Sequence, residues 1–127
     1  MKNVYYKNVS FYKSLNHAWS GLKVIFHDER NFRRDLVIAL CVIIAGILFN
    51  ISHFEWIAIS LVISAVLISE ALNSVIEAIC DTISCDFRLN IKYAKDVSAG
   101  AVLVSALVSI ITGLLIFMPY ILDLLKI

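Results

Sequence analysis

The sequence predicts an all-α membrane protein with three transmembrane helices, preceded by an amphipathic helix on the membrane surface. Hydrophobic residues make up 61% of the 127-residue chain, against about 45–50% in an average soluble domain, and the mean hydropathy is +0.87. Only one proline and four glycines occur, so the chain is poor in turn formers and suited to long helices. The apolar residues also gather into three long segments, as membrane-spanning helices require.

The predicted surface helix covers about residues 10–28. Apolar side chains recur there at helical spacing, while basic residues and a histidine occupy the rest of the helical wheel. The apolar positions are Phe11, Leu15, Ala18, Trp19, Leu22, Ile25 and Phe26, and the others are Lys13, His17 and Lys23. A helix with a basic face and aromatic anchors tends to lie in the membrane interface. Packing on the cytoplasmic end of the bundle is an equal alternative, and the two are compatible.

We expect spans at about residues 34–51, 55–80 and 97–122, all within a single domain, 1–127. A helix needs about 20 apolar residues to cross a bilayer. The first span has a short apolar core, which the preceding basic residues extend because their side chains can snorkel to the interface. The second span is long enough but contains two glutamates, and the third is the most uniformly apolar.

The distribution of basic residues predicts the orientation. Seven precede the apolar core of the first span, none lies in the link at 52–55, and three lie between the second and third spans. They are Lys2, Lys7, Lys13, Lys23, Arg30, Arg33 and Arg34, then Arg88, Lys92 and Lys95. The positive-inside rule therefore predicts a cytoplasmic N-terminus and a C-terminus outside.

The net charge, the N-terminal segment, the cysteines and the small residues of the third span limit the functions that the chain can have. The net charge of +1 argues against a nucleic-acid partner, and no signal peptide is apparent in the polar first 35 residues. Three cysteines lack the CxxC spacing of a metal or redox site and are expected to be unpaired structural thiols: Cys41, Cys80 and Cys85. Small residues recur at every fourth position of the third span, as in closely packed helices: Ala101, Ser105, Ser109 and Gly113.

The stretch Ser69 to Asp81, SEALNSVIEAICD, places polar residues at the cytoplasmic end of the second span. At about 100° per residue, these residues fall on one stripe of a helix. The stripe consists of Glu70, Asn73, Ser74, Glu77 and Asp81. An ionisable residue within a span is costly and is by default a functional candidate. A structural polar contact between helices is the alternative, but two carboxylates and an amide on one stripe fit it poorly.

Further charged residues lie on the same side of the membrane, Asp28-Glu29 before the first span and Lys95-Asp96 at the start of the third. Carboxylates from separate helices suit Mg²⁺, a lysine can hold phosphate, and a buried carboxylate can act as a general base. This combination predicts phosphoryl transfer from a nucleotide to a lipid, although no glycine-rich phosphate loop is present. A small proton- or ion-coupled transporter using Glu70 and Glu77 is the distant alternative, and a structural membrane subunit is a further one. A transporter would not need the Glu29 and Lys95-Asp96 groups.

The segments EALNSVIEAICD and AKDVSAGAVL resemble the prokaryotic diacylglycerol kinase family of small three-span lipid kinases. The similarity runs from about Phe11 to Phe117 and includes the stretches Trp19 to Lys23 and Glu29 to Arg33. The resemblance implies an ATP- and Mg²⁺-dependent lipid kinase in the inner, cytoplasmic membrane of a bacterium. It also implies a homotrimer whose active sites are shared between neighbouring subunits.

The resemblance implies a role for each matching residue. Glu70 matches the catalytic carboxylate, and Glu29 and Glu77 match the metal ligands. The implied nucleotide-binding residues are His17, Glu29, Asn73, Glu77, Asp86, Phe87, Arg88, Lys95 and Asp96. The implied lipid-binding residues are Ser14, Trp19, Lys23, Arg33, Trp56, Glu70 and Ala99.

The chain departs from the family pattern at several nucleotide-site positions. Arg88 stands where a histidine is expected, His17 where some members have tyrosine, and no basic residue lies near Ser10. The family divides into diacylglycerol kinases and undecaprenol kinases. The Glu55-Trp56 pair is more typical of the second branch, so undecaprenol is the predicted substrate and diacylglycerol the alternative.

Overall fold

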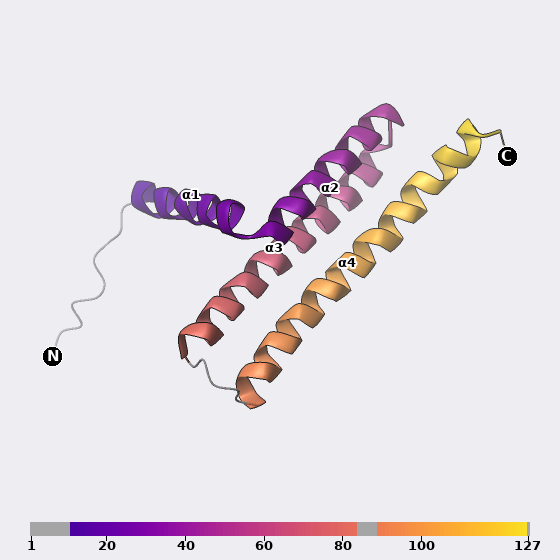
Figure 1. Ribbon diagram of the computed structural model, residues 1–127. Helices are drawn as coiled ribbons and strands as arrows, with labels where there is room; N and C mark the ends of the chain where they lie inside the picture. The colour runs from indigo at the N-terminus through magenta and orange to yellow at the C-terminus, as the bar shows by residue number, and fades with distance from the viewer. Residues whose placement is uncertain (1–10, 84–88, 127) are drawn as a thin grey trace.

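The computed structural model describes residues 11–83 and 89–126, which form four α-helices. Their bounds are α1 Phe11–Asp28, α2 Arg30–Leu48, α3 His53–Ile83 and α4 Leu89–Leu124. Helices α2, α3 and α4 run side by side, whereas α1 projects sideways from the point where α2 begins (Figure 1). The predicted all-helical class is confirmed. Cys85 and the predicted nucleotide-site residues Asp86, Phe87 and Arg88 lie outside the described residues.

Two of the described helices, α3 and α4, are long and apolar enough to cross a membrane. They contain 31 and 36 residues and extend beyond the expected spans at both ends. Helix α2 has 19 residues and begins with a charged turn, at Arg30 rather than at residue 34, and it ends at Leu48 rather than at residue 51. Because α2 is not among the helices that meet this criterion, the first expected span, at about residues 34–51, stays a prediction.

The best-packed part of the bundle lies around the turn that joins α2 to α3. Ile51, Ile59 and Ile116 are buried there. The Phe49 ring packs on the same cluster, with its centroid 6.0 Å from that of Phe117 and 5.9 Å from that of Tyr120. Most other large apolar side chains of α2, α3 and α4 are exposed, as expected of surfaces that face lipid or neighbouring subunits.

The turn between α2 and α3 depends on two specific residues. Asn50 has a positive φ of 50°, which asparagine tolerates better than most residues. The backbone N–H of Asn50 bonds to the Ile47 carbonyl and that of Ile51 to the Gly46 carbonyl, at 3.1 and 3.2 Å, which is the Schellman pattern of a helix end. A Cβ atom at Gly46 would lie 2.9 Å from the Trp56 ring, so glycine lets α3 turn back closely along α2.

Helix α1 has no buried residue and contacts its own bundle only at its end. There the Arg33 side chain, from the first turn of α2, donates hydrogen bonds to the carbonyls of Phe26, at 3.0 Å, and His27. These bonds satisfy backbone acceptors that the end of α1 would otherwise leave unpaired. The aromatic and basic residues of α1 are therefore available to lipid or to another subunit.

Candidate active site

Glu70 is the only charged side chain that is buried among the described residues, with 3% of its surface exposed. The side-chain amide of Asn31 is a polar neighbour of its carboxylate. Arg34 Nη2 in turn donates to Asn31 Oδ1 at 3.1 Å. Asn31 and Arg34 belong to the first two turns of α2, so the start of α2 covers Glu70 in the middle of α3 and supplies the polar neighbour that a buried carboxylate needs.

Two further carboxylates lie near Glu70. Both Asp35 and Glu29 interact with it through their charges. Like charges near one another repel, and the repulsion is stronger where water is scarce. A cation or a bound proton would relieve this repulsion, and either one is useful to a phosphoryl-transfer site.

A second polar group joins α3 to α4 farther along the bundle. The hydroxyl of Ser98 donates to Asn73 Oδ1 at 2.6 Å, and Asn73 Nδ2 donates to Glu77 Oε1 at 3.1 Å. Ser98 is buried, whereas Glu77 is exposed. This chain of hydrogen bonds connects an exposed carboxylate on α3 to the backbone region of Lys95 on α4.

Lys95 and Asp81 form an ion pair at the same seam, with Nζ 2.6 Å from Oδ1. The Glu77 carboxylate also acts on Lys95 through its charge. The pair holds the lysine against α3 rather than leaving its long side chain free in solvent. In this pair Lys95 lies along α3 on the side of Glu77, where a phosphate group could reach both.

The polar residues around Glu70 and those around Glu77 lie at different heights along the bundle. Helix α1 leaves the bundle where α2 begins, while α3 and α4 continue well past this level toward the link between them (Figure 1). Asn31 lies at the start of α2, next to the end of α1. Since Glu70 neighbours Asn31, it lies at the level of α1. Glu77 lies seven residues farther along α3, about 10 Å at the rise of an α-helix.

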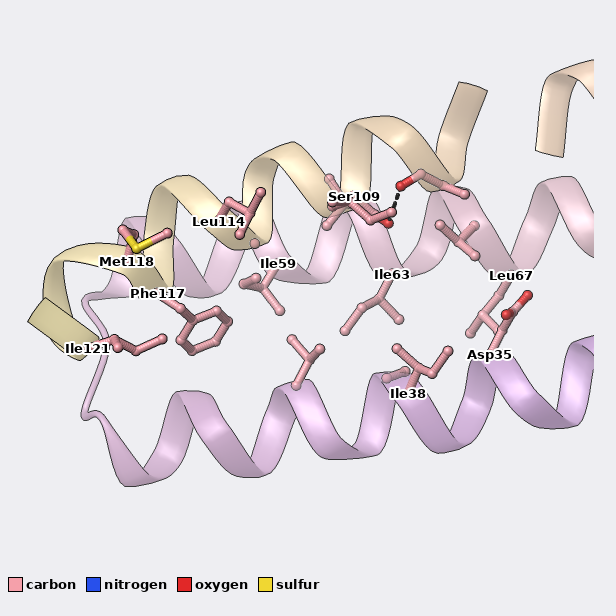
Figure 2. A pocket seen from close by; sticks show the side chains of 17 residues that line it. Asp35, Ile38, Ile59, Ile63, Leu67, Ser109, Leu114, Phe117, Met118 and Ile121 are labelled. Carbon is pink, nitrogen blue, oxygen red and sulfur yellow. Dashed lines mark hydrogen bonds between the residues drawn. The ribbon is translucent and has the colours of Figure 1, made fainter. Parts of the chain in front are cut away.

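An apolar cavity of about 450 Å³ lies between α2, α3 and α4. Its walls include Ile38 on α2, Ile63 on α3 and Leu114 on α4, and Asp35 stands at one end (Figure 2). Because the Asp35 carboxylate also acts on Glu70 through its charge, this end of the cavity is the end nearer the buried acid. The far end reaches Ile121, near the turn between α2 and α3.

The structure brings together the predicted residues Glu29 and Glu70 at one level, and Asn73, Glu77 and Lys95 at the other. It does not bring the predicted residues of α1 to Glu70 within one chain. Those residues are exposed on the projecting helix: Ser14, His17, Trp19 and Lys23. Asp96 and Ala99 are likewise exposed, on α4.

Two predicted lipid-binding residues have structural contacts instead. Trp56 packs on Gly46 at the opposite end of the bundle, about 21 Å along α3 from Glu70 at the helical rise. Arg33 bonds to the end of α1. Within one chain, neither side chain is shown at the buried carboxylate.

Sequence reasoning left four contacting residues out of the predicted site: Asn31, Arg34, Asp81 and Ser98. Asp81 lies on the predicted stripe, and Asn31 lies inside the Glu29 to Arg33 stretch. Ser98 follows Lys95 by three residues, a spacing that puts both on one face of a helix. No pattern in the sequence reveals that Asn31 reaches Glu70, because that contact joins different helices.

In the described part of the chain, no three His, Cys, Asp or Glu side chains converge on a position that could hold a metal ion. Mg²⁺ commonly takes only one or two carboxylates and completes its shell with substrate phosphates and water. Glu77 and Glu29 each present one carboxylate of this kind, but they lie at different levels of one chain, about 10 Å apart along the bundle.

The sequence model described as prokaryotic diacylglycerol kinase matches residues 16–117. The chain is 42% identical to the undecaprenol kinase of Bacillus subtilis, over 86% of this chain and 89% of that one. It is 32% identical to a diacylglycerol kinase of Synechocystis, over 97% of this chain and 71% of that one. It is 29% identical to the diacylglycerol kinase of Escherichia coli K12, over 79% and 82%. The chain thus belongs to the prokaryotic diacylglycerol kinase family of lipid kinases.

Proposed function

We propose that the protein transfers the terminal phosphoryl group of ATP to the primary hydroxyl of undecaprenol and releases undecaprenyl phosphate and ADP. Phosphorylation of diacylglycerol to phosphatidic acid is the alternative. The observation that carries the proposal is the buried Glu70 carboxylate on α3, together with an apolar cavity whose end at Asp35 is the end nearer to it. A lipid alcohol needs this combination of a base for its proton and an apolar surface for its tail.

In this proposal, Glu70 accepts the proton of the lipid hydroxyl while the hydroxyl oxygen forms its bond to phosphorus. The bond between that phosphorus and the bridging oxygen of ADP breaks. The Asn31 amide beside the carboxylate orients it, and Lys95 binds the phosphates as a point charge. When bound with the nucleotide, Mg²⁺ would neutralise phosphate charge, and Glu77 would hold it together with a Glu29 that the assembly proposed below would bring to it.

The choice of undecaprenol rests on the relatives. The chain shares more identity, 42%, with the relative named undecaprenol kinase than the 32% and 29% it shares with two relatives named diacylglycerol kinase. Both lipids present a primary hydroxyl at the membrane surface. Membership of a lipid kinase family argues against the transporter that the sequence alone left open.

We further propose a homotrimer with composite active sites and three spans, in the bacterial cytoplasmic membrane, with the N-terminus in the cytoplasm and the C-terminus outside. Three features support an assembly: α1 buries nothing against its own bundle, the cavity beside α4 is apolar, and Gly113 on its wall has nothing within 4 Å of an added Cβ. Lys95 and Asp81 also lie about 16 Å along the helix axis from Glu70. A neighbouring subunit could close this distance with its own residues.

The test uses purified protein in micelles with Mg-ATP and either undecaprenol or diacylglycerol. We expect phosphorylated undecaprenol from the wild type, and turnover about 10²–10⁴-fold lower in Glu70→Gln because an amide cannot accept the proton. Asp123→Asn, an exposed acid at the far end of α4, is the control and should retain the rate. Faster turnover of diacylglycerol would favour the alternative lipid. Absence of any lipid product would overturn the function, and a wild-type rate in Glu70→Gln would overturn the role of Glu70.

A further inference from the structure

Ser98 is the only uncharged polar side chain that is buried among the described residues, with 6% of its surface exposed. Its hydroxyl has two acceptors within reach, Asn73 Oδ1 at 2.6 Å and the Lys95 carbonyl at 3.0 Å. A serine hydroxyl carries one proton and can donate it to one acceptor at a time. The contact to Asn73 is the shorter of the two, so the proton is donated to Asn73 Oδ1.

An asparagine amide can point either its oxygen or its nitrogen at a given neighbour. With Oδ1 of Asn73 held by the Ser98 proton, Nδ2 faces Glu77 Oε1 at 3.1 Å and donates to it. In the reverse orientation, the amide oxygen would face the carboxylate oxygen, and the two acceptors would repel each other. The Ser98 proton, donated to Oδ1, and the Glu77 carboxylate, accepting from Nδ2, therefore favour the same orientation of the amide.

We infer that Ser98 is a positioning residue, which acts through Asn73 to hold the Glu77 carboxylate in place for a metal–nucleotide complex. Glu77 is exposed, so little besides the amide limits its side-chain conformations. A hydrogen bond to an ionised acceptor is among the stronger ones, and it engages one carboxylate oxygen while the other stays open to a cation. The inference rests on the proposed function for the identity of that cation complex, but its contacts are independent of it.

Outer partners that orient metal ligands commonly change metal affinity or activity about 10–100-fold when they are removed. We therefore expect Ser98→Ala to raise the half-saturating Mg²⁺ concentration about tenfold at fixed ATP, while KM for the lipid stays unchanged. Binding of Mn²⁺ with a non-hydrolysable ATP analogue, followed by electron paramagnetic resonance, should weaken by a similar factor. This second measurement needs no turnover, so a failure of the proposed lipid chemistry would leave it informative.

Ser105→Ala is the matched control. Ser105 makes another hydroxyl contact between α4 and α3, at 2.7 Å from Ser69, but it lies seven residues from Ser98, about 10 Å along the helix. This variant should match any loss of interhelical packing without changing the Mn²⁺ or Mg²⁺ dependence. A role through Asn73 also predicts that Ser98→Ala adds no effect in an Asn73→Ala background.

Three results would overturn the inference. The first is a Mn²⁺ affinity in Ser98→Ala equal to that of the wild type. The second is an equal loss of affinity in Ser105→Ala, which would indicate a general effect of α3–α4 packing. The third is a full, additional loss when Ser98→Ala is combined with Asn73→Ala, because the two residues would then act separately.

Discussion

The Tyr120 hydroxyl donates a hydrogen bond to Glu55 Oε2 at 2.8 Å, across 65 positions of sequence. The same carboxylate oxygen accepts the backbone N–H of Ser52 at 2.7 Å, and the Ser52 hydroxyl accepts the backbone N–H of Glu55 at 3.4 Å. This reciprocal pair is a capping box at the start of α3. Tyr120 therefore ties the end of α4 to the first turn of α3, at the opposite end of the bundle from Lys95.

Tyr120→Phe should lower the free energy of unfolding, because it removes a hydrogen bond to a charged acceptor and keeps the ring. The measurement is thermal unfolding in micelles, with kinase activity measured well below the transition. Activity there should be unchanged, since the bond is remote from Glu70. Tyr93→Phe, whose side chain is 70% exposed, is the control. Equal stability of Tyr120→Phe and wild type would show that the bond contributes nothing.

Gly46→Ala should destabilise the protein although alanine is the better helix former. The added Cβ would lie 2.9 Å from the Trp56 ring, and relief of such overpacking typically costs about 1–3 kcal/mol. Gly100→Ala is the matched control, because an added Cβ there meets nothing within 4 Å. It should gain up to about 1 kcal/mol from helix propensity. The two variants should therefore shift the thermal transition in opposite directions, and a shift in the same direction would contradict the Trp56 contact.

Glu29→Ala and Glu77→Ala should each raise the Mg²⁺ requirement. Each substitution removes an anionic oxygen ligand from a cation that prefers such ligands. Titration of Mg²⁺ at fixed ATP measures the half-saturating concentration, and Asp123→Asn again serves as the control. Unchanged half-saturation in both glutamate variants would exclude a metal ion shared between them.

Mixing two inactive variants, Glu70→Gln and Lys95→Ala, should restore part of the activity if active sites are composite. Some mixed trimers would then pair an intact base from one subunit with an intact lysine from another. The readout is lipid phosphorylation after exchange of subunits, and each variant mixed with itself supplies the baseline.

Two results would count against this arrangement. No recovery, with exchange of differently labelled subunits verified, would mean that both residues come from the same chain at each site. Cross-linking that yields only monomers would exclude the trimer itself.

Much of the architecture follows from local sequence. The apolar stretches and the helical spacing of the N-terminal segment predict four helices, because these patterns depend on neighbours along the chain. The bounds of α2 are less predictable. Its first turn is charged, and its end is set by Asn50 and by the packing of Trp56 on Gly46, a contact between separate helices.

The candidate site also has a part that the sequence predicts and a part that it does not. The stripe from Glu70 to Asp81 is visible in the sequence because it follows the helical period. The partners of these residues are not visible there: Asn31 reaches Glu70 from α2, and Ser98 reaches Asn73 from α4. The sequence pattern also cannot distinguish Trp56 in a lipid site from Trp56 packed on a glycine, since both use an aromatic residue near the membrane interface.

The extension of α3 and α4 beyond the level of α1 has a kinetic consequence for the proposed reaction (Figure 1). The acceptor alcohol approaches by lateral diffusion in a two-dimensional phase, while the phosphoryl donor approaches from bulk water about 10 Å farther out. The rate therefore depends on the mole fraction of the acceptor in the membrane and on the bulk concentration of the phosphoryl donor. Diluting the acceptor with inert lipid slows the enzyme at constant bulk composition, and changing the vesicle concentration at a fixed mole fraction leaves the turnover of each enzyme unaltered.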